Sequence, residues 1–330
     1  WESRLAPALL DGTGVDEHVF VRGNPRTPGE VVPRRSLEAL AGTGRLNHDR
    51  GSGRLELAKQ FTDPKQNPFI ARVAVNRVWH HLFGRGIVAS TDNFGVLGEP
   101  PTHPELLDYL AGEFVRNGWS VKRLIRRLVL SSTFRMSSKA DSDPADPTNQ
   151  LLHHFRLKRL EGEAIRDAML AVSGRLDRTI GGPPVPIRLT PFLDGRGRPK
   201  ASGPLNGAGR RSLYLAVRRN FLSPMLLAFD TPIPFSTVGR RQVSNVPAQA
   251  LILMNDPFVH QQAEVWAKRV LELPAGERVR EMYLSAFGRP PIEAEAAACR
   301  AFVEGKEDDV TAWADLAHAL FNVKEFVFVQ

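Results

Sequence analysis

Helical runs that carry their own start and stop signals are the feature of this sequence that most constrains its fold. One run extends from Phe69 to Phe83, where Pro68 precedes it and Gly84 ends it. Proline is tolerated in the first turn of a helix, and glycine adopts the left-handed conformation that closes one. Because such runs recur along the chain and alternating runs are few and short, the sequence predicts a mainly α fold.

Two further helices are predicted with defined N-terminal caps. In PTHPELLDYLAGEF, Thr102 is the expected N-cap, and Glu105 three residues later completes a capping box. In SVKRLIRRLVL, Ser120 is the expected cap, and the apolar residues face one side while most basic residues face the other. The second half supplies further helical patterns, with a break at Asp256-Pro257, across residues 159–177, 246–273, 277–303 and 310–329.

Strand-like patterns are short. His18 to Val21 alternate before a series of turn residues, which predicts a strand or an extended arm. Residues 210–219, RRSLYLAVRR, also alternate like a strand. The glycine- and charge-rich stretch from Gly42 to Arg54 predicts a surface loop. We therefore expect a mainly α, multi-helical globular fold with a few short β-strands and long Gly/Pro-rich loops.

Composition divides the chain into four predicted regions. A polar stretch punctuated by prolines is the best candidate for a linker. Residues 181–209 are rich in Gly and Pro and weak in periodicity, so they predict a long loop. The four regions are an N-terminal extended arm and loop (1–60), a helical core with the NRVW and HPELLD motifs (61–136), the linker (137–150) and a mainly helical second half (151–330).

The bulk composition is that of a globular protein, since 42% of the 330 residues are hydrophobic and 24% are charged. No apolar run reaches the roughly 18 residues of a membrane-spanning helix, so no span is expected. No signal peptide is evident at Trp1, where the sequence reads as trimmed from a longer chain.

The single cysteine, Cys299, excludes an internal disulfide, and its alanine-rich helical surroundings predict a buried thiol. The chain has no C-x-x-C-H motif, so covalent haem c is excluded within it. We expect no other cofactor within this chain.

The chain is basic, with 44 Lys+Arg against 36 Asp+Glu and a net charge of +8. An anionic partner such as an acidic glycan would explain this excess, but the scattered basic residues favour internal ion pairs. Adjacent arginines occur at 126–127, 210–211, 218–219 and 240–241, and the available internal partners are Glu161, Glu163, Asp167 and Asp230. Arg77, Arg240 and Arg241 are the candidates for anion binding. Nucleic-acid binding is not favoured, because aromatic residues are not interleaved with basic ones.

His80 and His81 lie at the end of the Phe69–Phe83 run. Adjacent side chains on a helix diverge by about 100°, so the two imidazoles cannot bind one ion together. Neither has the partner four residues away that a helical two-histidine metal site uses. Near a helix C-terminus they can instead satisfy the last carbonyls, and we favour this structural role over a catalytic one.

A catalytic site, if the chain has one, is expected in TDNFGVLGEPPTH. Asp92, Glu99 and His103 could converge there on one cation, with a neutral His103 as base or ligand. The alternative is loop architecture, in which Asp92 makes an Asx turn and His103 is hydrogen-bonded in the first helical turn. The spacing does not require convergence, so the three residues are candidates only and no metal is predicted.

Six phrases taken together resemble one family: RGNPRTPGEVVP, NPFIARVAVNRVWHHLFGRGIVASTDNFGVLGEPPTHPELLDYLAGEF, SVKRLIRRLVLSSTFR, RRSLYLAVRRN, FDTPIPFSTVGRRQVSNVPAQALILMND and LFNVKEFVFV. The chain resembles the C-terminal domain of unknown function, number fifteen fifty-three, of large secreted planctomycete-type proteins. In that family the domain commonly follows another domain of unknown function, and many members carry a c-type cytochrome domain and an export signal. The resemblance implies a bacterial, extracytoplasmic setting, a larger polypeptide, and haem c on a separate domain.

The resemblance extends to individual positions. Asn76, Trp79, His81 and Glu105 fall on family-typical positions, and together with the N-cap candidate Thr102 they form the predicted structural motif. Other family-typical positions are Arg77, Phe83, Gly84, Asp92, Phe94, Gly95, His103, Pro104, Asp108, Arg159, Glu163, Arg166, Asp167, Arg240, Arg241, Gln249 and Asn255. Asn93 stands where an Asp is usual, which weakens an interpretation of two adjacent acids as metal ligands. The family supplies no established reaction.

Three functions are compatible with these observations. The first is a non-catalytic scaffold or interaction module of an exported multidomain protein, linked to c-type cytochrome domains, whose partners are other domains of the same polypeptide. The second is an extracytoplasmic hydrolase or oxidoreductase acting on polysaccharide, with its site around Asp92, Glu99 and His103. The third is a module that binds acidic polysaccharide through the excess arginine. The lack of a coherent catalytic constellation favours the first.

Overall fold

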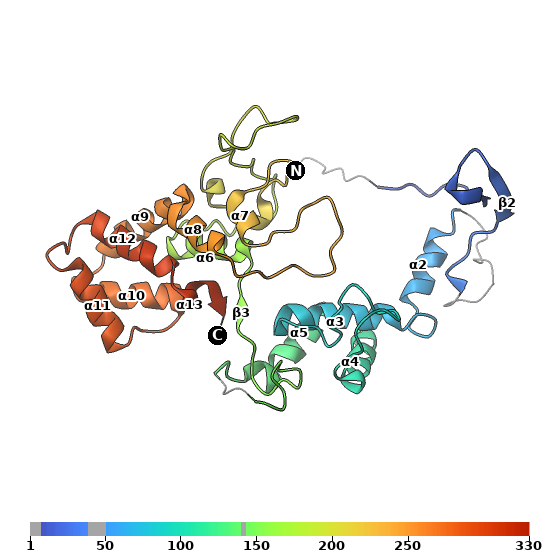
Figure 1. The fold of residues 1–330 in the computed structure, drawn as a ribbon, viewed down its shortest axis with the longest axis horizontal. Helices are drawn as coiled ribbons and strands as arrows, with labels where there is room; N and C mark the ends of the chain where they lie inside the picture. Colours follow the sequence, from blue (N-terminus) through green and yellow to red (C-terminus); the bar gives the residue numbers. More distant parts are fainter. Residues whose placement is uncertain (1–7, 39–50, 140–142, 330) are drawn as a thin grey trace. The chain divides into compact units, whose positions relative to one another are not determined.

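The computed structural model describes residues 8–38, 51–139 and 143–329. The chain forms two compact units, Trp1–Arg135 and Met136–Gln330 (Figure 1). Helices predominate in both, and the β-structure of the described residues consists of two two-stranded sheets. The fold is therefore mainly α with a few short strands, as predicted. Most of the loop predicted at Gly42–Arg54 lies outside the described residues.

The first unit begins with an antiparallel β-hairpin and continues with helices. Its elements are β1 (Glu17–Phe20), η1 (Val21–Gly23), β2 (Pro28–Val32), α2 (Arg54–Thr62), α3 (Phe69–Phe83), α4 (Pro104–Arg116), α5 (Val121–Val129) and η2 (Thr133–Arg135). β1 agrees with the predicted strand to within one residue at each end. Helix α2 was not predicted and lies partly in the segment that we expected to be arm and loop.

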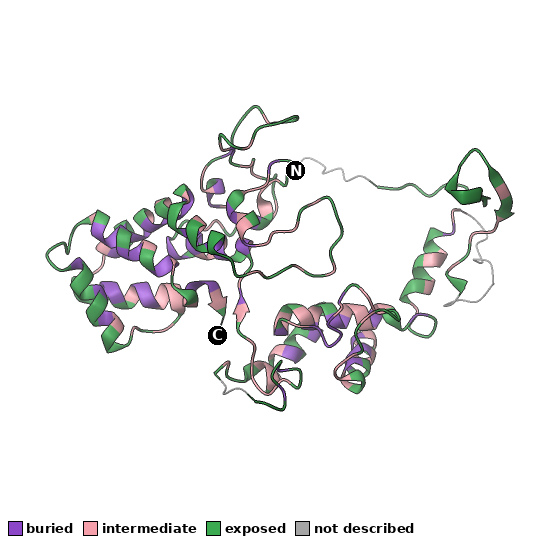
Figure 2. Ribbon diagram, viewed as in Figure 1, coloured by how far each residue is buried: buried purple, intermediate pink, exposed green. Residues whose placement is uncertain are grey.

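The core of the first unit forms where α3 packs against α4 and α5. Val75 and Trp79 of α3, Leu110 and Phe114 of α4, and Leu128 of α5 are all buried (Figure 2). Their spacing of three to four residues puts the apolar side chains of each helix on one face. Burial of these faces fixes the three helices against one another and positions the NRVW and HPELLD motifs.

The capping prediction is confirmed at one helix and wrong at another. Ser120 caps α5, because its side chain accepts a backbone N–H of the first turn at 3.4 Å. At α4 the N-cap is His103 and no side chain caps the helix, so Thr102 and Glu105 form no capping box. Pro104 at the first helical position has no N–H to be capped. The Thr102 hydroxyl instead donates to a backbone carbonyl 15 residues earlier, at 3.3 Å.

The second unit is a bundle of helices in which β3, near its start, pairs antiparallel with β4 near its end. Its elements are β3 (Lys158–Arg159), α6 (Gly162–Val172), η3 (Gly207–Gly209), η4 (Ser212–Tyr214), α7 (Pro224–Ala228), α8 (Pro247–Asn255), α9 (Pro257–Leu271), α10 (Ala275–Phe287), α11 (Glu293–Val303), α12 (Val310–Phe321), α13 (Lys324–Val327) and β4 (Phe328–Val329). Among the described residues, no helix combines the length and the apolar character that crossing a bilayer requires.

The core of the second unit is centred on α9 and α12, which pack along each other. Trp266 of α9 stacks on Phe321 of α12 with ring centroids 5.1 Å apart. Met169 of α6 and Met282 of α10 are fully buried beside them. Cys299 of α11 is buried, as predicted, and burial raises the pKa of its thiol. The thiol is therefore protonated and inert at neutral pH.

The strand predicted at 210–219 is wrong. Within residues 181–209, where we predicted a long loop, the structure has the short turn η3 at Gly207–Gly209 and a bridge at Val185. Over residues 210–219 the backbone makes the short turn η4 and takes part in isolated β-bridges only. Both the N–H and the hydroxyl of Ser212 donate to Asp167 on α6, each at 2.7 Å. These bonds hold the chain against a helix, so its alternating side chains have no neighbouring strand to pair with.

Candidate functional site

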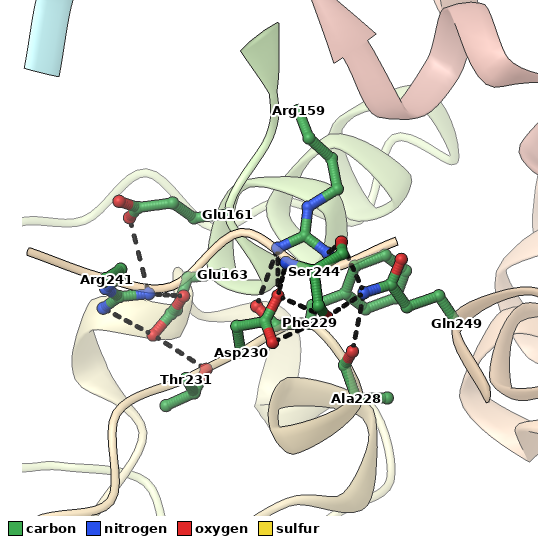
Figure 3. Close-up of polar contacts among 10 residues, drawn as sticks. All are labelled: Arg159, Glu161, Glu163, Ala228, Phe229, Asp230, Thr231, Arg241, Ser244 and Gln249. Atoms are coloured by element: carbon green, nitrogen blue, oxygen red, sulfur yellow. Dashed lines mark hydrogen bonds and ion pairs between the residues drawn. The ribbon is translucent and has the colours of Figure 1, made fainter. Parts of the chain in front are cut away.

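A polar cluster of the second unit is centred on Asp230, two residues after the end of α7 (Figure 3). Asp230 adopts a left-handed backbone conformation with φ of 61°, which is uncommon for residues other than glycine. Its carboxylate accepts hydrogen bonds from Arg159 at 2.7 Å, from the Ser244 N–H at 2.8 Å and from the Ser244 hydroxyl at 2.8 Å. The carboxylate therefore connects β3 to a segment 14 residues further along the chain.

Arg159 extends this cluster from β3, and its side chain is only 3% exposed. Besides Asp230, its guanidinium donates to the carbonyl of Ser244 at 3.0 Å and to that of Phe229 at 3.4 Å. It also lies over the Phe229 ring, 5.4 Å from the centroid. Gln249 of α8 donates to the Ser244 carbonyl as well, at 3.2 Å. We call Arg159, Asp230, Ser244 and Gln249 the Asp230 clamp, which holds Ser244 by its N–H, hydroxyl and carbonyl.

A second cluster lies beside the first on α6. Glu163 accepts two hydrogen bonds from Arg241, at 2.6 and 3.1 Å, and one from the Thr231 hydroxyl at 3.4 Å. Glu161 lies 3.5 Å from the same guanidinium. The hydrogen bonds that Arg241 donates to Glu163 raise the pKa of Arg241. We call these four residues the Glu163 clamp (Figure 3).

The two clamps hold both ends of one long connection, loop 231–246, between α7 and α8. Asp230 and Thr231 fix the point at which the loop leaves α7. Arg241 and Ser244 fix its return. The clamp side chains bond to the backbone or to one another, and the buried Nε of Arg159 makes no hydrogen bond to any residue that the structure describes. The cluster is equipped to shape a loop, and it contains no histidine or cysteine for proton transfer or nucleophilic attack.

Because the Asp230 clamp depends on an ionised carboxylate, we expect the second unit to lose stability at low pH. Burial alone would raise the pKa of Asp230, but hydrogen bonds from Ser244 and the Arg159 guanidinium outweigh it and lower that pKa. The stabilisation from the ionised carboxylate is complete above the unfolded pKa of about 3.9, and it is lost as pH falls through the lower folded pKa. We expect urea unfolding to show falling stability below about pH 4.

The variant Asp230→Asn isolates this contribution, because asparagine tolerates the left-handed conformation but does not ionise. We expect its stability to be lower than that of the unchanged protein at pH 7, and the difference to shrink towards about pH 2.5. A difference that stays constant over this range would show that Asp230 is not the titrating group.

The predicted catalytic candidates lie in the loop between α3 and α4 and do not form a common site. Asp92 is exposed, and the Asx turn predicted for it is made by Asn93, whose side chain accepts the Gly95 N–H at 3.0 Å. Glu99 lies 3.4 Å from Arg85, and His103 is the N-cap of α4. Among the described residues, no three His, Cys, Asp or Glu side chains are grouped so that they could hold a metal ion.

The motif residues of α3 have structural surroundings. Asn76 is completely buried, and its amide donates to the carbonyl of Val88 and accepts its N–H, both at 2.9 Å. Gly86 must be glycine, because a Cβ there would lie 2.4 Å from the Val88 carbonyl oxygen and 2.9 Å from Asn76. Trp79 stacks on Phe83 at 4.0 Å. The N–H and the carbonyl of Val88, which follows α3, therefore find in the Asn76 amide the hydrogen-bond partners that a regular backbone element would otherwise supply.

The anion-binding candidates do not share a surface that the structure defines. Arg77 is exposed on α3 of the first unit, whereas Arg240 and Arg241 belong to the second. The Arg241 guanidinium is bound by the carboxylate of Glu163, so internal pairing of this arginine is confirmed. Arg240 is exposed beside it in loop 231–246.

Sequence reasoning noted Arg159, Gln249 and Asp230 separately but did not connect them, and it missed Ser244. The only local signal was the phrase FDTPIPFSTVGRRQVSNVPAQ, which contains the last three of these residues. The partners lie up to 85 residues apart in the sequence. Pairing at that distance depends on the packing of β3, α6 and α8, which no periodicity in the sequence encodes.

The fold and the clamps define a two-unit, mainly α protein in which two polar clusters fix the ends of a long loop. The chain belongs to the PSD1 family, described as a protein of unknown function (DUF1553), whose sequence model matches residues 53–303. The matched region includes both clamps and the motif residues of α3 and α4. Comparison with curated proteins and with solved structures gave no match.

Proposed function

We propose that this chain is a non-catalytic interaction module that binds another folded domain through loop 231–246 and α8. The observation that carries the proposal is a set of apolar side chains that the clamps hold in contact with solvent. Phe235 and Val243 in the loop are 64% and 69% exposed, and Leu251 on α8 is 57% exposed. Large apolar side chains that are exposed on one loop and on the helix that follows it are available for burial against a partner.

The clamps support an interaction role because they order the loop in advance. A loop of 16 residues without regular structure would normally lose much conformational freedom on binding. Asp230 and Thr231 fix one end, and Arg241 and Ser244 fix the other. Ordering before binding reduces the entropic cost of association, so a modest apolar surface can give useful affinity.

We further propose an exported, bacterial setting and a partner that is another domain of the same polypeptide. The resemblance to secreted planctomycete-type proteins with c-type cytochrome domains supports this part of the proposal. Haem c would then be carried on a separate domain, and the present chain would hold that domain in place. The enzymatic alternative has less support, because Asp92, Glu99 and His103 have separate surroundings.

A photo-crosslinking experiment in the complete polypeptide tests the proposal. Benzoylphenylalanine replaces Phe235, and crosslinked peptides are identified by mass spectrometry. We expect adducts with one defined segment outside residues 1–330. The matched control places the same amino acid at Lys306, which is exposed in the turn between α11 and α12.

A substitution in the surface completes the test. Val243→Asp removes an apolar contact and introduces a charge, and we expect it to reduce the yield of the Phe235 adduct about ten-fold, since one buried apolar side chain contributes roughly 1.5 kcal/mol or more. The melting temperature of the chain should not change, because Val243 is exposed. Adducts confined to residues 1–330, or equal adducts from positions 235 and 306, would contradict the proposal.

A further inference from the structure

A concave, arginine-lined pocket lies between the end of α4 and α5 in the first unit. Its volume is about 340 Å³. Phe114 and Leu124 line it with buried side chains, and Arg123, Arg126 and Arg127 line it with exposed ones. The pocket thus combines an apolar floor with a cationic rim, and its size falls within the range of small-molecule sites.

The charge of the pocket follows from the sequence of α5. Leu124 and Leu128 face the core, which leaves the basic residues of VKRLIRRLV on the outside. Glu113 is the one acidic residue among the described residues that line the pocket. Hydrogen bonds from Arg116 and then Arg127 lower the pKa of Glu113, so it is ionised and already neutralised. The remaining field at the pocket is positive.

Arg127 is fixed in advance, whereas its neighbours are available to a ligand. Its guanidinium donates to Glu113 and to the hydroxyl of Tyr109, and it lies 5.1 Å from the centroid of the Tyr109 ring. Arg123 and Arg126 are exposed, and within the described part of the chain no ion pair links either of them to a carboxylate. Two guanidinium groups beside one pocket suit the bidentate recognition of a sulfate or a carboxylate.

The pocket offers more than a site for an isolated anion. Ser120 and Asn117 line it between the two helices. The Ser120 side chain accepts the N–H of Arg123, which leaves its own hydroxyl hydrogen to donate. The amide nitrogen of Asn117 donates to Glu113, so Asn117 offers its amide oxygen. The Ser120 hydroxyl, this oxygen and the guanidinium groups beside an apolar floor fit a polyhydroxylated ring that carries an acidic group. The N-terminus of α5 adds a favourable partial charge.

We propose that this pocket binds an acidic sugar unit, sulfated or carboxylated, of a polysaccharide. The arginines of α5 line one side of a cavity whose other side is lined by residues from the end of α4 and the turn after it, which distinguishes the site from a membrane-binding helix. The nine residues of α5 include no aromatic side chain on which a nucleic-acid base could stack. The site lies in the first unit and does not depend on loop 231–246.

The experiment measures binding of the complete chain to four probes by isothermal titration calorimetry at low salt. The probes are a sulfated tetrasaccharide from heparin, a trigalacturonate, a neutral trisaccharide and a single-stranded oligonucleotide. We expect the two acidic sugars to bind, and their relative affinities to distinguish sulfate from carboxylate. Binding should weaken steeply as salt is raised. Equal binding of the neutral sugar, tighter binding of the oligonucleotide, or no binding of either acidic sugar would overturn the proposal.

Two double variants separate a pocket from diffuse attraction. Arg123→Gln with Arg126→Gln removes two pocket charges, and we expect it to weaken binding of the acidic sugar at least ten-fold. Lys122→Gln with Arg135→Gln removes the same charge from exposed positions that do not line the pocket, and we expect less than a two-fold effect. Equal losses in the two variants would overturn the proposal.

A conservative variant provides the final control. Arg123→Lys with Arg126→Lys keeps the charge but removes the planar forks, so we expect an intermediate loss of affinity. All variants should melt at the temperature of the unchanged chain, since the substituted side chains are exposed. Full affinity in the lysine variant would argue against bidentate recognition and overturn the assignment of these two arginines.

Discussion

Replacement of Arg159 by alanine is expected to destabilise the second unit by about 3 to 5 kcal/mol, the range for removing one partner of a buried ion pair. The guanidinium is 3% exposed and serves the Asp230 carboxylate and the carbonyls of Ser244 and Phe229. Its loss leaves a partly buried carboxylate without its positive charge, removes the Arg159 donor from the Phe229 carbonyl, and leaves the Ser244 carbonyl with Gln249 as a donor. Urea unfolding monitored by tryptophan fluorescence would measure the change in free energy.

Two comparisons make this prediction specific. Arg159→Lys retains the charge but cannot reach three acceptors, so it should fall between alanine and the unchanged protein. Arg280→Ala, at an exposed position on α10, should change stability by no more than about 0.5 kcal/mol. Hydrogen exchange of loop 231–246 should accelerate in Arg159→Ala and not in Arg280→Ala. A loss below about 1 kcal/mol in Arg159→Ala would mean that the Asp230 clamp does not hold the unit together.

The helices could be predicted from sequence because their ends are determined locally. Helix α3 begins after Pro68 and ends at Gly84, where φ is 82°, as the flanking residues indicated. The break between α8 and α9 lies at Asp256, whose side chain accepts the Phe258 N–H at 2.8 Å. Proline, glycine and capping residues act within one turn, so a single sequence contains the information.

Predictions from local sequence signals were wrong where a residue distant in the sequence forms a hydrogen bond with the same polar group. Thr102 has the chemistry of an N-cap, but its hydroxyl is bonded to the carbonyl of Ile87. Ser212 lies in a strand-like pattern, but Asp167 on α6 binds its backbone. In both cases a tertiary hydrogen bond overrides a local preference, and the sequence pattern contains no record of that bond.

The candidate site was the least predictable part of the molecule. Histidines and acids in and near the NRVW and HPELLD motifs were weighed as catalytic or metal-binding candidates, because those residue types perform most proton transfer and metal binding. The structure instead concentrates polar contacts on arginine, amide and hydroxyl groups, as at Asn76 and Ser244. These groups satisfy buried backbone that regular elements leave unpaired, so their importance emerges only when the elements are packed.

The contrast between Asn76 and the exposed acid Asp92 leads to the second large prediction. Asn76→Ala is expected to destabilise the first unit by about 2 to 4 kcal/mol, because the N–H and the carbonyl of Val88 both lose their partner inside the core. Asp92→Ala should cost no more than about 0.5 kcal/mol, since Asp92 is exposed. His103→Ala should cost no more than about 1 kcal/mol, because it removes an N-cap residue whose side chain makes no capping bond.

Thermal unfolding of the three variants under one set of conditions would measure this ranking. If Asn76→Ala had the same melting temperature as the unchanged protein, the Asn76 amide would not be the group that orders the segment from Gly86 to Val88. If Asp92→Ala or His103→Ala were as destabilising as Asn76→Ala, the loop before α4 would be a structural element in its own right. The proposed ranking instead attributes the stability of this motif to one amide. It follows from two observations, that Asn76 is 0% exposed and that its amide makes both hydrogen bonds to the backbone of Val88.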